Sequence, residues 1–331
     1  MEENPHPFDE IAKQVLANYE LLEPCPTFIR HSDNVTYKVT TANSETFLLR
    51  IHIPVTSAMG AHGASVDMVN SEVTWLLALG QETNLTLQKP IRNRSGALVT
   101  CMPKEDGSTI NCTLLGWVDG KPYTRELETE RTAYRIGTLL ATLHNQASQW
   151  KIPEGFKRPR RDKNYFENML SGIMPAVKDG RISLSDYSEL SRSISLLIDM
   201  ISRLDEGQQF HGILHADTHK GNMLYHEGEI RLIDFSFCAF GNYMFDLGIC
   251  LSDMKEELHR FCLQGYQSVR GLPVNYQQMI EAFFIGSIVG AFSFWVPNPN
   301  AQEILARKVP QITRDYAAKF NQGEHFWFSS G

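Results

Sequence analysis

The sequence predicts an α+β fold with a small, β-rich N-terminal part and a larger, mainly helical C-terminal part. Two observations predict it. Segments in which apolar and polar residues alternate lie before residue 117, which is typical of strands. After about residue 127, apolar residues recur every three or four positions, which is typical of helices. The stretch 116–122 between them is rich in Gly, Asp and Pro and predicts a boundary between two lobes, 1–116 and 117–331.

Composition agrees with a globular chain of this kind. The chain has 331 residues, of which 42% are hydrophobic and 21% charged, enough for two packed lobes. Its formal charge of -7 argues against nucleic acid as a partner, because binding to phosphate backbones needs a basic face. Six scattered cysteines without a Cys-x-x-Cys pair, after a polar and acidic start, predict a reduced, cytoplasmic protein without structural zinc.

The N-terminal part is expected to contain two early strands, a helix and further strands. The segment after residue 65 places valines and leucines on one helical face. The expected elements are, in order, a short amphipathic helix over 8–22, strands over 35–40 and 46–53 joined by a polar turn at 41–45, a helix over 65–79, and paired strands over 98–102 and 111–117.

The C-terminal part is expected to be helical, with helices over 127–147 and 184–204. The apolar stretch 282–296 is shorter than the roughly 20 residues that span a bilayer and contains Gly and Ser, so it predicts a buried helix and no membrane contact. The basic run 157–163 is expected to be a solvated loop. The aromatic run 326–328 is expected to dock onto the helical part.

A short motif within the helical part carries the chemistry. The segment His215-Ala216-Asp217-Thr218-His219-Lys220-Gly221-Asn222 is followed by two strand-like arms, 222–226 and 229–235, around the turn pair Glu227-Gly228. A hairpin of this kind brings Asn222 and Asp234 together at its open end. Carboxylate and amide oxygens suit Mg²⁺, and a loop Asp such as Asp217 can orient a hydroxyl and accept its proton. The alternative interpretation of each residue alone is a turn or helix-cap residue.

This motif resembles the catalytic loop of the aminoglycoside phosphotransferase and choline kinase superfamily, relatives of protein kinases that share their two-lobed fold. The resemblance implies Asp217 as the catalytic residue, and Asn222 and Asp234 as magnesium ligands. His219 stands where protein kinases usually carry Lys. It implies structural support of the site from His215, His219 and Asp246, although capping of the following helix is an equal alternative for Asp246.

The resemblance also implies residues that bind the nucleotide. By strand order, Arg50 and Glu72 occupy the positions of the kinase Lys–Glu pair that holds the α- and β-phosphates. The turn with Ser32 and Asn34 lies where the phosphate-covering loop begins, although an ordinary Asx turn is an alternative. The backbone of Gly116 and Val118 is expected to pair with the adenine.

The resulting hypothesis is a kinase that depends on ATP and Mg²⁺ and phosphorylates a hydroxyl of a small molecule. The expected acceptors are an aminoglycoside- or macrolide-type antibiotic, an amino alcohol, or an amino acid such as homoserine. Regions 156–204 and 254–331 are expected to form the acceptor site. Two alternatives stay open, a protein Ser/Thr kinase of the bacterial stress-response type and a non-catalytic nucleotide-binding protein. The sequence leaves the oligomeric state open.

Four acidic residues are candidates for facing a cationic acceptor, although each is more simply a solvent-facing helix residue: Asp253, Glu256, Glu257 and Glu281.

Overall fold

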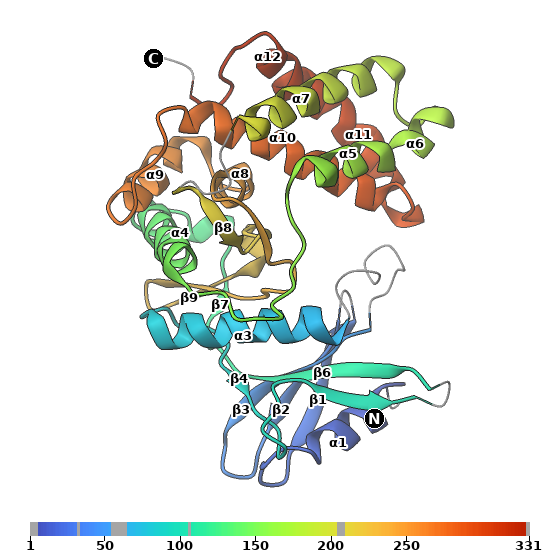
Figure 1. Cartoon of the computed structure of the whole chain (residues 1–331), viewed down its shortest axis with the longest axis vertical. Helices are drawn as coiled ribbons and strands as arrows, with labels where there is room; N and C mark the ends of the chain where they lie inside the picture. The colour runs from blue at the N-terminus through green and yellow to red at the C-terminus, as the bar shows by residue number, and fades with distance from the viewer. Residues whose placement is uncertain (1–5, 32–33, 54–64, 105–106, 204–208, 329–331) are drawn as a thin grey trace.

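The protein is described here from a computed structural model, which covers residues 6–31, 34–53, 65–104, 107–203 and 209–328. Figure 1 shows a sheet region formed by the N-terminal part of the chain and a larger, mostly helical region formed by the rest. The predicted α+β arrangement is therefore confirmed.

The N-terminal sheet is antiparallel and has the strand order β1-β2-β3-β6-β4, with β5 also paired to β6. The expected pairing of the segments near 98–102 and 111–117 is confirmed as β5 with β6. The strands are β1 Cys25–His31, β2 Val35–Thr40, β3 Thr46–Ile51, β4 Pro90–Ile91, β5 Thr100–Pro103 and β6 Thr109–Gly116.

Two helices accompany this sheet. The short helix α1, Asp9–Leu16, packs with strand residues in a small apolar core of its own. The helix α3, Val66–Glu82, begins at Ser65, whose hydroxyl accepts the Met68 N–H. Most of the buried apolar residues of α3 belong to the larger core that continues into the helical region. The helix α3 therefore connects the sheet to the rest of the molecule.

The N-terminal predictions differ most from the structure at two elements. Strand β1 was not predicted, because it lies at the edge of the sheet, is almost entirely exposed and begins with Cys25-Pro26, so it lacks the alternation of a half-buried strand. The first helix ends at Leu16, six residues before the predicted end.

The C-terminal region contains two small sheets among its helices. One sheet has the order β10-β9-β7 and the other pairs β11 with β8. The strands are β7 Lys121–Pro122, β8 His211–Leu214, β9 Met223–His226, β10 Glu229–Leu232 and β11 Ala239–Asn242. The α-helices are α4 Glu130–Gln149, α5 Lys163–Gly172, α6 Met174–Lys178, α7 Leu184–Ser202, α8 Met244–Ser252, α9 His259–Gln267, α10 Tyr276–Trp295, α11 Gln302–Ile312 and α12 Ala318–Asn321.

The chain passes between the two regions over residues 117–120. Strand β6 ends at Gly116 in the N-terminal sheet, while β7 begins at Lys121 and pairs with β9 in the C-terminal region. This path agrees with a lobe boundary at 116/117, which stays a prediction.

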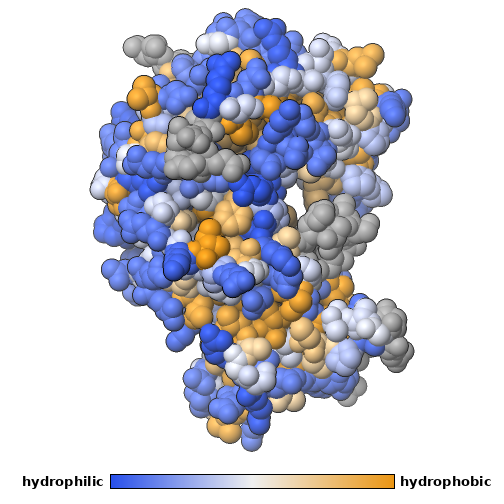
Figure 2. Space-filling model, viewed as in Figure 1, coloured by the Kyte–Doolittle hydropathy of each residue, from blue (hydrophilic) through white to orange (hydrophobic). Residues whose placement is uncertain are grey.

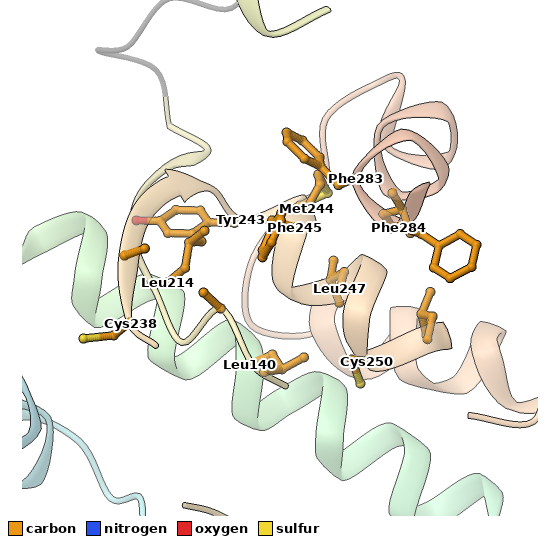
Figure 3. Packing of buried hydrophobic residues seen from close by; sticks show 14 of the residues in the cluster. Leu140, Leu214, Cys238, Tyr243, Met244, Phe245, Leu247, Cys250, Phe283 and Phe284 are labelled. Atoms are coloured by element: carbon orange, nitrogen blue, oxygen red, sulfur yellow. The ribbon is translucent and has the colours of Figure 1, made fainter. Parts of the chain in front are cut away.

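The larger core contains residues of α3, α4, β8, α8 and α10. In Figure 3, Leu140, Leu214, Tyr243 and Phe283 are among the side chains that come together from these elements. Apolar residues also gather on the face shown in Figure 2 where the sheet region meets the helical region. Helices α4 and α9 pack very closely at Gly137. A Cβ added at this position would lie 1.8 Å from the Cys262 carbonyl oxygen. The larger core thus extends from the helical region to α3, whereas the sheet and α1 keep their own smaller core.

Helix α10 contains most of the apolar stretch 282–296, which the sequence predicted to be a buried helix. It contains 20 residues, and by length and composition alone it could cross a membrane. The predicted reason for excluding a span, insufficient length, is therefore wrong. The predicted burial is confirmed, because α10 packs against α5, α7 and α8 and 56% of its most apolar window is buried.

Candidate active site

The loop that carries Asp217 is held by one buried carboxylate, that of Asp246 in the first turn of α8. Its Oδ2 accepts the His215 N–H at 2.9 Å and its Oδ1 accepts the Ala216 N–H at 2.7 Å. The Thr218 hydroxyl donates to the Asp246 carbonyl oxygen at 2.6 Å. Ala216 has a φ of 62°, a left-handed conformation that residues with a Cβ rarely adopt. The Asp246 side chain thus holds a strained turn, and it makes no helix-capping bond.

The carboxylate of Asp217 is fixed by the residues around it. The Asp217 N–H donates to Nδ1 of His215 at 3.2 Å, and Nε2 of the same ring donates to the Ile233 carbonyl at 3.1 Å. The Asn222 amide nitrogen donates to Oδ2 of Asp217 at 2.6 Å. Nε2 of His219 lies 3.4 Å from Oδ1 of Asp217, and this contact is the first cause of a raised pKa of His219. One oxygen of Asp217 is therefore held by Asn222, and the other faces His219.

The predicted hairpin is present, with β9 and β10 in register around Glu227 and Gly228, both of which have positive φ. At its open end the Ile233 N–H donates to the Asn222 carbonyl at 2.9 Å. This bond places Asp234 next to the strand end that carries Asn222. The Asn222 amide nitrogen is used by Asp217, so its oxygen is the atom left for a metal.

These oxygens suit a magnesium ion. Two protein oxygen ligands completed by phosphate oxygens and water are usual for Mg²⁺ in phosphoryl transfer. Within the described residues, no three His, Cys, Asp or Glu side chains gather as a metal set.

A buried ion pair connects the N-terminal sheet and α3 to Asp234. Nη2 of Arg50 lies 2.7 Å from Oε1 of Glu72, and Nη1 lies 3.9 Å from Oδ1 of Asp234. Burial alone lowers the pKa of Arg50, but the charges of Glu72 and Asp234 outweigh it and raise the pKa. Burial alone raises the pKa of Asp234, but the charge of Arg50 and the Ser236 hydroxyl outweigh it and lower the pKa. Both groups are therefore charged at neutral pH.

The structure describes only part of the surroundings of the other residues expected to bind the nucleotide. Ser32 lies outside the described residues, and Asn34 is buried at the start of the β2 segment. The Gly116 N–H donates to the Lys89 carbonyl at 2.7 Å, so only the Gly116 carbonyl can pair with a base. Among the described residues, no hydrogen-bond partner is found for the Val118 N–H. These roles stay predictions.

Two further residues contact Asp234 and were not predicted. The Asp234 N–H donates to Oε1 of the buried Gln88, just before β4, at 3.2 Å. Nη2 of Arg30, on β1, lies 3.8 Å from Oδ2 of Asp234. The Trp75 ring of α3 packs edge-on against the ring of Phe235, the residue after Asp234, with ring centroids 5.6 Å apart. No local pattern marks these residues, because each contacts the site across the junction of the two regions.

The prediction that the basic run 157–163 is a solvated loop is wrong for Arg158. Arg158 is only 7% exposed, and its guanidinium donates to backbone carbonyls at the junction of the two regions. Its neighbour Lys157 is exposed and forms a surface ion pair with Asp67, as expected for such a run. A charge run in the sequence does not reveal which member turns inward.

The acidic residues considered for the acceptor site differ in their surroundings. Asp253, Glu256 and Glu257 are exposed, as expected. Asp253 also contacts the loop that carries Asp217, because its Oδ2 accepts the Lys220 N–H at 2.9 Å. The expectation of a solvent-facing Glu281 is wrong. Glu281 is buried in α10, where it accepts backbone N–H groups of the C-terminal segment.

The fold defines a kinase-like class of protein, in which a sheet region and a helical region meet at the ion pairs of Arg50 with Glu72 and Asp234. The model of the phosphotransferase enzyme family matches residues 27–281, and the chain belongs to this family.

Known proteins with related sequence or structure agree with this assignment. The chain is similar to a homoserine kinase of Neisseria meningitidis serogroup B, with 24% identity over 74% of this chain and 79% of that protein. Its fold is similar to that of a microcompartment-associated aminopropanol kinase, with a TM-score of 0.76, 22% identity and coverage of 95% and 98%. The structure of amicoumacin kinase in complex with AMP-PNP, Ca²⁺ and Ami gives a TM-score of 0.75 at 17% identity, with coverage of 97% and 95%.

Proposed function

We propose that this chain transfers the γ-phosphate of ATP, with Mg²⁺, to a hydroxyl of a small molecule. The observation that carries the proposal is the Asp217 carboxylate, which Asn222 holds at 2.6 Å beside the hairpin end that carries Asp234. The proposed acceptors are a small amino alcohol, a hydroxylated amino acid or a hydroxylated antibiotic. Support comes from the names of the related proteins, which are kinases of homoserine, aminopropanol and amicoumacin.

In this proposal the residues of the chain mainly align the reactants. Asp217 accepts the hydrogen bond, and then the proton, of the attacking hydroxyl. Asn222 and Asp234 would hold Mg²⁺, which neutralises charge on the phosphate oxygens. Arg50, kept charged and oriented by Glu72 at 2.7 Å, presents its guanidinium to the phosphates.

The test is a screen for ATP consumption over amino alcohols, hydroxylated amino acids and hydroxylated antibiotics, with Asp217→Asn as the matched control. Turnover is expected with one of these classes. Asp217→Asn should reduce kcat by about 10²- to 10⁴-fold, because proton transfer by a positioned side chain contributes that much. Nucleotide affinity, measured by calorimetry, should stay within about threefold, because the metal ligands remain.

Each other outcome argues against part of the proposal. Normal turnover by Asp217→Asn would contradict the role of Asp217. Phosphorylation of a generic protein acceptor, without turnover of any small molecule, would favour a protein kinase. Nucleotide binding without turnover of any acceptor would favour a non-catalytic nucleotide-binding protein.

A further inference from the structure

Arg158 contacts three backbone carbonyls that belong to two different parts of the site. Its Nε donates to the Cys238 carbonyl at 2.6 Å, and its Nη2 donates to the Ser236 carbonyl. Its Nη1 donates to the Met68 carbonyl at 3.1 Å. Ser236 and Cys238 follow Asp234, while Met68 lies in the first turn of α3. We name these three bonds the Arg158 clamp.

The chain around Arg158 is fixed to the same two parts. The Lys157 N–H donates to the Ser71 hydroxyl of α3 at 2.8 Å. On the other side, the Phe240 N–H donates to the Pro159 carbonyl at 2.8 Å, and the Arg161 N–H donates to the Phe240 carbonyl at 2.7 Å. The segment 157–161 therefore lies between α3 and β11, and the Arg158 clamp sits in a fixed backbone rather than on a free loop.

The clamp needs arginine. A guanidinium carries five N–H donors in a rigid fork and can bond several carbonyls at once, whereas an ammonium is a point charge on a flexible stem. Among the described residues, no carboxylate forms an ion pair with Arg158. A buried cation must be compensated by its hydrogen bonds, so the three carbonyls are what stabilises the charge in this position.

Two of the three bonds of the clamp reach the chain next to a residue of the proposed site. In an α-helix the Met68 carbonyl accepts the N–H of residue 72, so Arg158 contacts the turn that presents Glu72 to Arg50. The Ser236 hydroxyl donates to Oδ1 of Asp234 at 2.6 Å. The clamp thus joins the Glu72 turn and the Asp234 loop, which the Arg50 side chain also joins.

We propose that Arg158 is a positioning residue, which holds α3 and the Asp234 loop in the one register where Arg50, Glu72 and Asp234 meet. This inference rests on the proposed function. If Arg158 has this role, a buried arginine within the fold sets the arrangement of the nucleotide site.

The test compares Arg158→Met and Arg158→Lys with the adjacent control Lys157→Met, which removes only an exposed ion pair. Arg158→Met should raise the KM for Mg·ATP by about tenfold and shift the Mg²⁺ requirement upward, while the KM for the acceptor stays within about twofold. Arg158→Lys should give a partial rescue. Lys157→Met should behave as wild type.

Hydrogen exchange without ligand gives a second, activity-independent readout. Amides of 236–238 and 68–72 should exchange about tenfold faster in Arg158→Lys than in wild type, because the register is loosened locally. If Arg158→Met does not fold, the Lys variant alone decides. Wild-type exchange and wild-type affinity for Mg·AMP-PNP in the folded variants would overturn the inference and leave the proposed function intact. Failure of the wild type itself to bind Mg·AMP-PNP would instead overturn the proposed function, and this inference with it.

Discussion

The two acidic residues at the centre of the site differ in how the fold prepares them. Asp217 follows Ala216, whose φ is 62°, and Asp234 itself has a φ of 64°. Such conformations cost about 1–3 kcal/mol for residues with a Cβ and persist only where the surroundings impose them. The Asp246 carboxylate stabilises the conformation of Ala216 by accepting two backbone N–H groups. The Gln88 side chain accepts the N–H of Asp234. Strain thus occurs at Asp234 and at the residue directly before Asp217.

At the scale of the residue, we predict that Asp234→Asn weakens binding of Mg·ATP by about tenfold or more, because a charged metal ligand is lost. The apparent Mg²⁺ requirement should rise in parallel. Titration of activity or of nucleotide binding against Mg²⁺ measures both effects. Asp217→Asn is the matched control and should keep the wild-type Mg²⁺ dependence. An unchanged Mg²⁺ titration in Asp234→Asn would refute its role as a ligand.

At the scale of the element, the C-terminal segment is held by one residue of α10. Oε1 of the buried Glu281 accepts the N–H groups of Phe326 and Trp327, both at 2.8 Å, and Oε2 lies 2.8 Å from Nδ1 of His325. The Trp327 ring also packs against Phe284 with ring centroids 4.5 Å apart. The predicted docking of the aromatic run is confirmed, but no pattern in the sequence indicated that the Glu281 carboxylate holds it.

We therefore predict that Glu281→Ala lowers the free energy of unfolding by about 2–4 kcal/mol, because two backbone donors lose their acceptor in a largely buried place. Glu281→Gln keeps an acceptor oxygen and should cost less than half as much. Urea denaturation of the two variants measures the difference. Equal stability of wild type and Glu281→Ala would show that the segment is not held by this residue.

At the scale of the whole molecule, three buried histidines make stability depend on pH. Burial lowers the pKa of His52, an effect strengthened by Arg50. Burial also lowers the pKa of His144 and His259, although hydrogen bonds to Asp246 and to a backbone carbonyl oppose it. The folded protein therefore binds fewer protons than the unfolded chain below the ordinary histidine pKa of about 6.5. Stability contributed by these groups is present above that pH and is lost as the pH falls.

The prediction is that the free energy of unfolding decreases between pH 7 and pH 5 by up to about 2 kcal/mol for each of these histidines. His219, whose pKa is raised by Asp217, acts with the opposite sign and reduces the total. Urea denaturation at both pH values measures the change. His144→Gln should flatten the dependence, because it removes one of the three groups. A stability that is flat over this range would contradict the prediction.

A second prediction at this scale concerns the nucleotide. Because Arg50, Glu72 and Asp234 join the sheet region to the helical region, bound Mg·AMP-PNP should stabilise the whole fold. At a hundred times its Kd the expected gain is about 2.7 kcal/mol. Thermal denaturation with and without Mg·AMP-PNP measures the shift in Tm, with the nucleotide and EDTA as the control. A Tm that does not move would argue against a nucleotide site between the two regions.

Much of the fold could be predicted because its signals are local. The turn pair Glu227-Gly228 predicted the hairpin, apolar residues on one helical face predicted α3, and the recurrence of apolar residues after residue 127 predicted α4. The end of α4 was placed too early, because its last turn continues through polar residues to Gln149. Helix and turn signals lie within a few residues of the structure they specify.

The sequence by itself determined the α+β class, the hairpin and the motif from His215 to Asn222. It could not determine which side chains complete the site. Arg158 and its acceptor Cys238 are 80 residues apart in the chain, and Gln88 and Asp234 are 146 apart. Periodicity and turn chemistry describe interactions within one element, whereas these contacts exist only because α3, β11 and the hairpin pack together. The tertiary structure therefore decided which arginine of a basic run is buried and which carboxylate holds the C-terminus.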